Sequence, residues 1–145
     1  MTTVARRAAR ALLVDPAGRV LLLRGRDPAR PEVTWWFTPG GGLDPGEDGP
    51  AALRREVREE TGLDLAGTDL DPAVLHRTVD FELEGVAYRQ EEDFFRVAVP
   101  AFDVDTSAWT DLERRSVDLV RWWDAAALAS TSETVYPLGL HELLG

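Results

Sequence analysis

The residues most able to do chemistry are the glutamates of the segment "AALRREVREETGL". Successive residues of a helix are rotated by about 100°, which places Glu56, Glu59 and Glu60 together on one face. Glu56 and Glu60 stand one helical turn apart, and such like-charged pairs weaken an isolated helix by roughly 0.2–0.5 kcal/mol. Clustered carboxylates reduce this repulsion by binding a hard divalent cation, which prefers oxygen ligands. The alternative is a solvated helix face that binds nothing.

The flanking residues indicate where this helix begins and ends. Pro50 suits the first helical turn, because its missing amide hydrogen has no helical partner there, and Gly62 suits the left-handed position just past the end. We therefore predict a helix over about Pro50–Thr61. The glycines at 40–42 let the backbone come close to a metal or a phosphate. The side of the helix expected to face the core consists of Leu53, Val57 and Thr61.

These residues share one spacing: Gly41, five residues, Glu47, seven residues, then "REVREETGL" from Arg55 to Leu63. This string of 23 residues resembles a complete Nudix box, the signature of the Nudix hydrolases. The resemblance implies an α+β fold of the Nudix type, an α/β/α sandwich in which a mixed β-sheet is flanked by helices and the box forms a loop, a helix and a loop. It also implies a Mg²⁺-dependent pyrophosphohydrolase, with Mn²⁺ as a substitute metal. Such an enzyme cleaves a diphosphate linkage in a nucleoside triphosphate or a nucleoside diphosphate derivative.

The resemblance also implies roles for individual residues. Arg55 would pair with Glu47 and hold the helix and the loop in register. The general base is either Glu56 or Glu113, the latter expected in a loop before a late strand in "TDLERRSVDLVRWW", with Asp111 as a weaker neighbour. The implied metal ligands are Glu56, Glu59, Glu60 and the Gly40 carbonyl.

A different class of function is a non-catalytic Nudix-like domain that senses or regulates through a bound nucleotide. Such a domain would be free to lose its metal carboxylates. This chain keeps Glu56, Glu59 and Glu60, which favours the enzyme.

Substrate contacts are harder to derive from the sequence. Arg24 and Arg26 end a predicted strand and are candidates to meet a phosphorylated ligand, although solvated side chains are the alternative. Trp35 and Trp36 must face opposite ways if they share a strand, so at most one lines the site. We take Trp36 as the candidate that stacks on a base.

The remaining patterns predict mainly strands. A hairpin is expected from "ARALLV" and "RVLLLRG" across "DPAG", a third strand from "TWWFT", and a longer strand pair turning near Glu84 and Gly85. In that pair, alternation points one of Glu91 and Glu92 inward. The segment "VDLVRWWD" is another strand candidate, followed by short helices around "AAALA" and "GLHELL".

Length and composition limit the class of protein. The 145 residues, 44% of them hydrophobic, predict one domain over 1–145. A net charge of -10 disfavours a nucleic-acid polymer and leaves a small-molecule nucleotide as partner. The absence of cysteine excludes disulfides and thiolate chemistry. No apolar run is long enough for a signal peptide or a membrane span, so we expect a cytoplasmic protein without a membrane partner, and a homodimer stays open.

Overall fold

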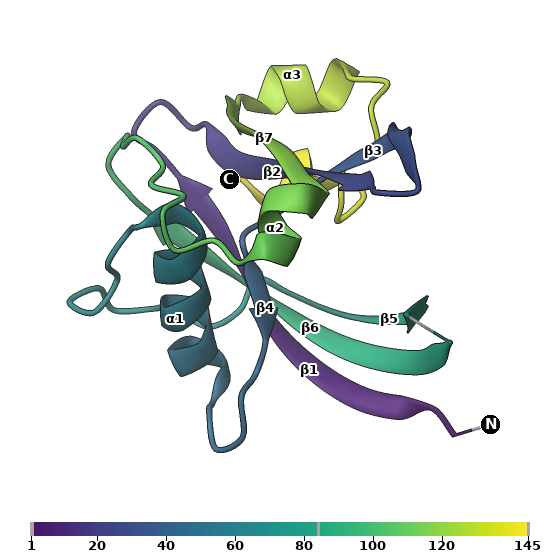
Figure 1. Cartoon of the computed structure of the whole chain (residues 1–145). Helices are drawn as coiled ribbons and strands as arrows, with labels where there is room; N and C mark the ends of the chain where they lie inside the picture. Colours follow the sequence, from purple (N-terminus) through teal and green to yellow (C-terminus); the bar gives the residue numbers. More distant parts are fainter. Residues whose placement is uncertain (1, 84, 145) are drawn as a thin grey trace.

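A curled mixed β-sheet forms the centre of the computed structural model, which describes residues 2–83 and 85–144 (Figure 1). Over these residues the sheet has seven strands, with β3-β2-β1-β6-β5 as its main path, while β4 pairs with β1 and β7 pairs with β2. The strands are β1 Val4–Val14, β2 Val20–Asp27, β3 Arg30–Phe37, β4 Gly40–Gly42, β5 Leu75–Leu83, β6 Val86–Ala98 and β7 Val117–Trp123. The helices are α1 Gly49–Thr61, α2 Asp111–Ser116, α3 Ala125–Ser130 and the 3₁₀ helix η1 Leu140–Leu143.

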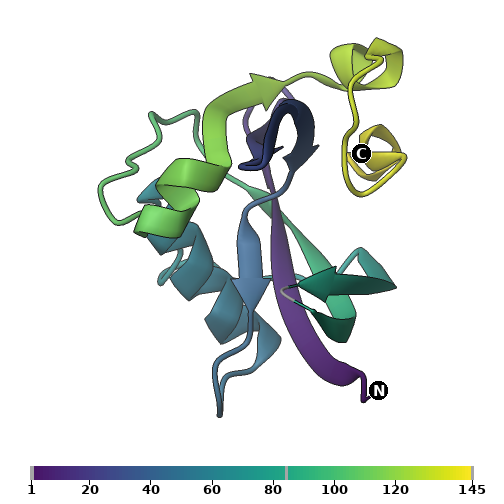
Figure 2. The same ribbon diagram turned by 45° about the vertical axis from the view of Figure 1, so that its right-hand side comes forward.

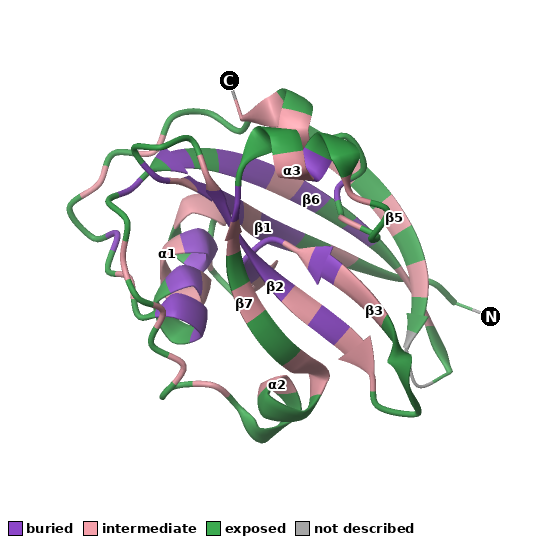
Figure 3. Cartoon of the chain, turned by 90° about the horizontal axis from the view of Figure 1, so that it is seen from above, coloured by how far each residue is buried: buried purple, intermediate pink, exposed green. Residues whose placement is uncertain are grey.

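Two apolar clusters cover the two faces of this sheet. Figure 3 shows buried residues along β1, β2 and β6 and along α1. Leu12 and Leu13 are both fully buried but belong to different clusters, because neighbouring residues of a strand point to opposite faces. The cluster around Leu13 packs under α1, and the cluster around Leu12 packs under α3 and η1. Figure 2 shows α1 and the C-terminal helices on different sides of the strands. The predicted mixed sheet flanked by helices is confirmed.

The hairpin predicted for β1 and β2 is correct only at its turn. The Gly18 amide donates to the Asp15 carbonyl at 2.9 Å, and Val14 faces Val20 as the one antiparallel pair that joins the two strands within the described residues. Beyond that pair, β1 runs parallel to β6 over its whole length, and β2 lies between β3 and β7. β1 and β2 each contain consecutive buried residues, so both of their faces are covered. Such strands lie in the middle of a sheet with a neighbour on each side, rather than pairing only with each other.

The later elements follow the predicted order with two local differences. β5 and β6 pair antiparallel, with Gly85 at φ 79°, whereas Glu84 of the predicted turn lies outside the described residues. The segment "TDLERRS", expected as a loop, forms the short helix α2, and "GLHELL" forms a 3₁₀ turn. Within residues 2–83 and 85–144, none of the helices has the length and apolar character needed to cross a membrane.

Candidate active site

Helix α1 carries the box carboxylates and is closed by specific groups at both ends. At its start, Asp48 accepts a hydrogen bond from the Ala51 amide at 2.8 Å. At its end, Gly62 adopts φ 80° and its amide donates to the Arg58 carbonyl at 2.9 Å. These caps confirm the predicted helix and fix the direction of its glutamates. Its buried residues are Ala52, Leu53, Val57, Glu60 and Thr61.

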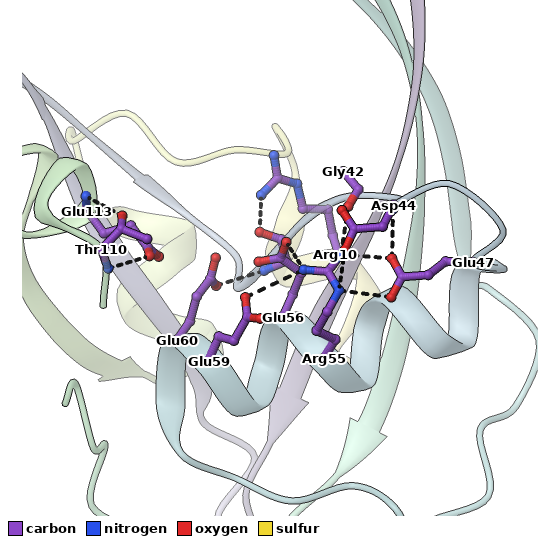
Figure 4. Close-up of polar contacts among 11 residues, drawn as sticks. Arg10, Gly42, Asp44, Glu47, Arg55, Glu56, Glu59, Glu60, Thr110 and Glu113 are labelled. Carbon is purple, nitrogen blue, oxygen red and sulfur yellow. Dashed lines mark hydrogen bonds and ion pairs between the residues drawn. The ribbon is translucent and has the colours of Figure 1, made fainter. Parts of the chain in front are cut away.

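Arg55 ties α1 to the loop before it (Figure 4). Its Nε and Nη2 donate to the two carboxylate oxygens of Glu47, each at 2.8 Å, and Nη2 also donates to the Gly42 carbonyl at 3.0 Å. This is the bidentate geometry in which guanidinium–carboxylate pairs are strongest. The hydrogen bonds from Arg55 lower the pKa of Glu47 to about 2. The structure therefore brings the predicted pair together.

Glu60 is a buried carboxylate in the floor of the site. Only 7% of the residue is exposed, and its Oε2 accepts a hydrogen bond from the Gly40 amide at 2.9 Å. Burial raises the pKa of Glu60 well above its usual value, and the neighbouring negative charge of Glu56 adds to this shift. Burial raises the pKa of Glu56 as well, although Arg55 opposes the shift from 2.9 Å.

The close approach of Glu56 to the glycine loop explains one of the glycines. A Cβ atom built on Gly41 would lie 2.6 Å from Oε1 of Glu56, closer than any real contact allows. A side chain at this position would push Glu56 out of the site. Gly41 therefore allows the carboxylate to pack against the loop.

The predicted metal ligands are only partly assembled. Glu59 is 49% exposed and its carboxylate lies 3.5 Å from Arg55 Nη1, while the Gly40 carbonyl accepts from Arg10 Nη1 at 3.1 Å. Among the residues that the structure describes, no three His, Cys, Asp or Glu side chains converge as a metal site. In this structure arginines contact two of the four implied ligands, Glu59 and the Gly40 carbonyl, and the ligand set remains a prediction.

The chemistry of the donors nevertheless fits a divalent cation. Glu60 is buried and the neighbouring Glu56 is partly buried, and this burial makes their ionised forms costly. A dication beside them offsets both this cost and their mutual repulsion. Oxygen donors of this kind suit Mg²⁺ and Mn²⁺.

Glu113 lies in α2 and helps to cap the N-terminus of that helix. Its carboxylate accepts from the Thr110 amide at 3.0 Å, and the Glu113 amide donates to Thr110 Oγ1 at 3.2 Å, which is a capping box. The charge of Glu113 is close enough to contribute to the raised pKa of Glu60. The structure thus places this candidate base in a helix rather than a loop, and its role as a base remains a prediction. Asp111 is exposed in the first turn of the same helix.

Arg24 and Arg26, the predicted phosphate contacts, are both engaged by other residues of the chain. Arg24 makes two hydrogen bonds to the Asp118 carboxylate, at 2.9 and 2.7 Å, and Arg26 donates to the Arg115 carbonyl at 3.0 Å. Neither side chain lines the cavity of about 710 Å³ that lies beside the glycine loop. Because strand β7 brings Asp118 against Arg24, this arginine is neutralised by the protein itself.

Trp36 was the wrong choice between the two tryptophans. It is 2% exposed, its ring meets the Trp123 ring edge-on with centroids 5.1 Å apart, and its Nε1 donates to Glu133 at 3.2 Å. Trp35 instead lines the cavity. The predicted opposition of the two rings is confirmed: Trp36 faces the core and Trp35 faces the cavity.

A cavity of about 710 Å³ lies beside the glycine loop and contains residues that the sequence did not single out. Strand alternation did predict one inward glutamate in β6, and Glu92 is that residue. The arginines of β1 and β5 carried no spacing signal, since strand partners decide which of them converge. The polar side chains missed by sequence reasoning include Arg6, Arg10, Arg77, Asp80 and Gln90.

Known proteins resemble this chain in sequence and in fold. The NUDIX domain is matched over residues 4–138, so the chain belongs to the Nudix family. Nudix hydrolases generally need a divalent metal.

Two curated relatives are similar over part of their sequences. The dihydroneopterin triphosphate diphosphatase of Escherichia coli (strain K12) is 34% identical over 91 residues, 57% of this chain and 57% of that protein. The nucleoside triphosphatase NudI of Escherichia coli O1:K1 / APEC is 40% identical over 60 residues, 41% of this chain and 43% of that protein. The chain thus spans about half the length of the curated relatives that it matches.

Solved structures share the fold over nearly the whole chain. The MutT protein from Methanosarcina mazei Go1 aligns with a TM-score of 0.69 at 23% identity, covering 99% of this chain and 93% of that one. The E. coli dihydroneopterin triphosphate pyrophosphohydrolase aligns with a TM-score of 0.60 at 27% identity, covering 90% of each chain.

Proposed function

We propose that this chain is a Mg²⁺-dependent pyrophosphohydrolase, with Mn²⁺ as a substitute metal. It cleaves a diphosphate linkage in a nucleoside triphosphate or a nucleoside diphosphate derivative. The observation that carries the proposal is the pair of buried Glu60 and partly buried Glu56 beside the glycine loop, next to a cavity of about 710 Å³. The triphosphate substrates in the names of the two curated relatives support the same class of substrate.

The reaction requires water to attack one phosphorus atom of the diphosphate. A new oxygen–phosphorus bond forms, the bridging oxygen–phosphorus bond breaks, and the bridging oxygen leaves with its electron pair on the second phosphate. A carboxylate accepts the proton that the water loses. A bound divalent cation supplies charge neutralisation and lowers the pKa of water. Glu56 and Glu60 would hold that cation, and Arg55 keeps helix and loop in register.

Glu113→Gln tests which carboxylate accepts the proton. Glutamine serves in a capping box as glutamate does, so this change removes the basic group while keeping the cap on Thr110. If Glu113 is the base, we expect kcat at saturating Mg²⁺ to fall by about 10²–10⁴-fold, with loss of the acidic limb of the pH–rate profile. Full kcat with the limb retained assigns the proton to Glu56. Glu113→Ala, which also removes the cap, separates the structural contribution.

Stabilisation by Mg²⁺ is expected to increase with pH. The pKa of Glu60 is raised above its ordinary value of 4.5 by burial, so the folded protein without metal retains a proton that the unfolded chain loses. Stability of the metal-free protein therefore falls as pH rises from 4.5 through the folded-state pKa. Bound Mg²⁺ favours the ionised carboxylate and offsets this loss.

The measurement is the increase in Tm caused by Mg²⁺ across about pH 5–8. The increase should grow with pH in the wild type and be smaller and nearly constant in Glu60→Gln. An equal increase at every pH in both proteins contradicts metal binding at Glu60.

A screen of diphosphate compounds tests the proposed function as a whole. Nucleoside triphosphates, nucleotide sugars, ADP-ribose and dinucleoside polyphosphates are incubated with the protein and Mg²⁺, and the phosphate-containing products are identified. Cleavage of at least one class is expected. Binding without any cleavage would instead support the nucleotide-sensing alternative.

A further inference from the structure

One wall of the cavity contains a trio of charged residues from three strands: Arg10 of β1, Arg77 of β5 and Glu92 of β6. Arg10 Nε donates to Glu92 Oε2 at 2.9 Å, and Arg77 Nε donates to Glu92 Oε1 at 2.7 Å. Glu92 is only 2% exposed, so the two arginines hold a buried carboxylate between them. Gln90, also buried, donates to Oε2 at 3.1 Å and completes its hydrogen bonds.

This trio carries an excess of positive charge. Burial acts to raise the pKa of Glu92, but Arg10 and Arg77 hold it below its usual value, so the carboxylate is ionised. Two guanidinium groups against one carboxylate leave one net positive charge at the wall of the cavity. In a chain whose net charge is -10, this local excess attracts an anion to the cavity.

The orientation of both arginines also suits an anion. Each donates to Glu92 through its inner Nε, and no hydrogen bond joins a terminal nitrogen of either arginine to that carboxylate among the described residues. Within the described residues, Arg10 Nη2 and both terminal nitrogens of Arg77 have no hydrogen-bond acceptor. The two side chains remain 22% and 28% exposed and line the cavity. Guanidinium groups held in this way bind phosphate oxygens with defined geometry.

The position of the trio relates it to the box carboxylates. Gly40 donates its amide to Glu60 and accepts Arg10 Nη1 on its carbonyl, at 2.9 and 3.1 Å. Arg10 and Glu60 therefore lie on the two sides of one peptide segment. An anion bound by the trio would lie next to the proposed cleavage site, with the Trp35 ring lining the same cavity.

We propose that Arg10 and Arg77, oriented by Glu92, bind the substrate phosphate that carries the organic group, and that this group occupies the cavity beside Trp35. This assignment rests on the proposed function. Glu92 is a positioning residue, since it acts through the two arginines and touches no reacting atom.

Calorimetric titration with guanosine 5′-monophosphate and cytidine 5′-monophosphate, in EDTA, tests this assignment without turnover. We expect the wild type to bind at least one of them, and Arg77→Ala to weaken that binding by about tenfold or more. Arg77→Lys keeps the charge without the guanidinium fork and should fall between. The matched control is Arg96→Ala, which removes an exposed arginine of β6 outside the cavity and changes the net charge equally.

Glu92→Gln distinguishes orientation from simple attraction. This change increases the positive charge of the wall, so attraction alone predicts tighter binding, whereas loss of orientation predicts weaker binding. We expect weaker binding by about tenfold. Glu92→Asp, compared at temperatures below each variant's Tm, keeps the assignment testable if Glu92→Gln is unstable.

The outcomes separate this assignment from the proposed function. Failure of the wild type to bind either nucleotide, or unchanged binding in Arg77→Ala, overturns the assignment even if hydrolysis is observed. Weakened binding in the trio variants, without cleavage of any diphosphate, supports the assignment and rejects the hydrolase. Where hydrolysis occurs, Arg77→Ala should raise KM more than it lowers kcat.

Discussion

Glu60→Gln should lower the turnover of the preferred diphosphate substrate by at least about a hundredfold, because it removes a proposed ligand of the cation that neutralises transition-state charge. The same change should leave the metal-free protein at least as stable as the wild type. Burial makes the ionised form of Glu60 costly, and the amide oxygen of glutamine still accepts from Gly40. A loss of activity without a loss of stability is the expected signature of a metal ligand.

Turnover and Tm are measured together, with Glu82→Gln as control, since Glu82 is an exposed glutamate of β5. Glu59→Gln is also expected to cost about a hundredfold in turnover. It should not raise stability, because Glu59 is half exposed. Near-normal turnover of either box variant with Mg²⁺ present removes that residue from the ligand set.

Arg55→Ala should lower both stability and activity. Arg55 holds the Glu47 carboxylate with two hydrogen bonds and also donates to the Gly42 carbonyl, so its loss leaves the loop without an anchor. We expect Tm to fall by roughly 5 °C or more. Arg58→Ala is the matched control, because Arg58 is an exposed arginine on the same helix.

The pH dependence of Tm tests whether the Arg55–Glu47 pair causes this loss of stability. The folded-state pKa of Glu47 is about 2, below its ordinary value of 4.5, so the stabilisation from this carboxylate is present above pH 4.5 and is lost as pH falls toward 2. The Tm difference between wild type and Arg55→Ala should shrink over that range. An unchanged Tm in Arg55→Ala at neutral pH shows that the pair does not hold the box together.

The local features of the box could be predicted from the sequence because they depend on neighbouring residues. Pro50 and Gly62 mark the ends of α1 through backbone chemistry, and the predicted helix agrees with Gly49–Thr61 to within one residue. The opposite orientations of Trp35 and Trp36 follow from strand alternation alone. Which of the two rings faces the core depends on distant Trp123, and the sequence does not determine that choice.

The substrate side of the site could not be predicted because it depends on strand pairing. Arg24 is a candidate phosphate contact in the sequence, but strand β7 brings Asp118 within hydrogen-bond distance of it. Arg10 and Arg77 lie 67 positions apart in the numbering and converge only because β1 and β5 both pair with β6. No periodicity within one segment records such a contact between segments.

The capping role of Glu113 shows a further limit of sequence reasoning. The residues from Thr110 to Glu113 fit a capping box, which marks the start of a helix. The expectation of a loop for this segment overlooks that pattern. The helix fixes the carboxylate on Thr110, which gives Glu113 a structural role beside any catalytic one. Activity measured on Glu113→Ala alone would therefore confuse two effects.

Hydrolysis of the preferred diphosphate in ¹⁸O-labelled water is the direct test of the proposed metal-dependent attack of water on phosphorus. With Mg²⁺, one phosphate-containing product should gain a single ¹⁸O atom from the attacking water, EDTA should abolish this incorporation, and Glu60→Gln should slow it by at least about a hundredfold. Labelled product that forms at the same rate in EDTA would contradict the metal dependence. Label in the organic part of the substrate would contradict attack on phosphorus.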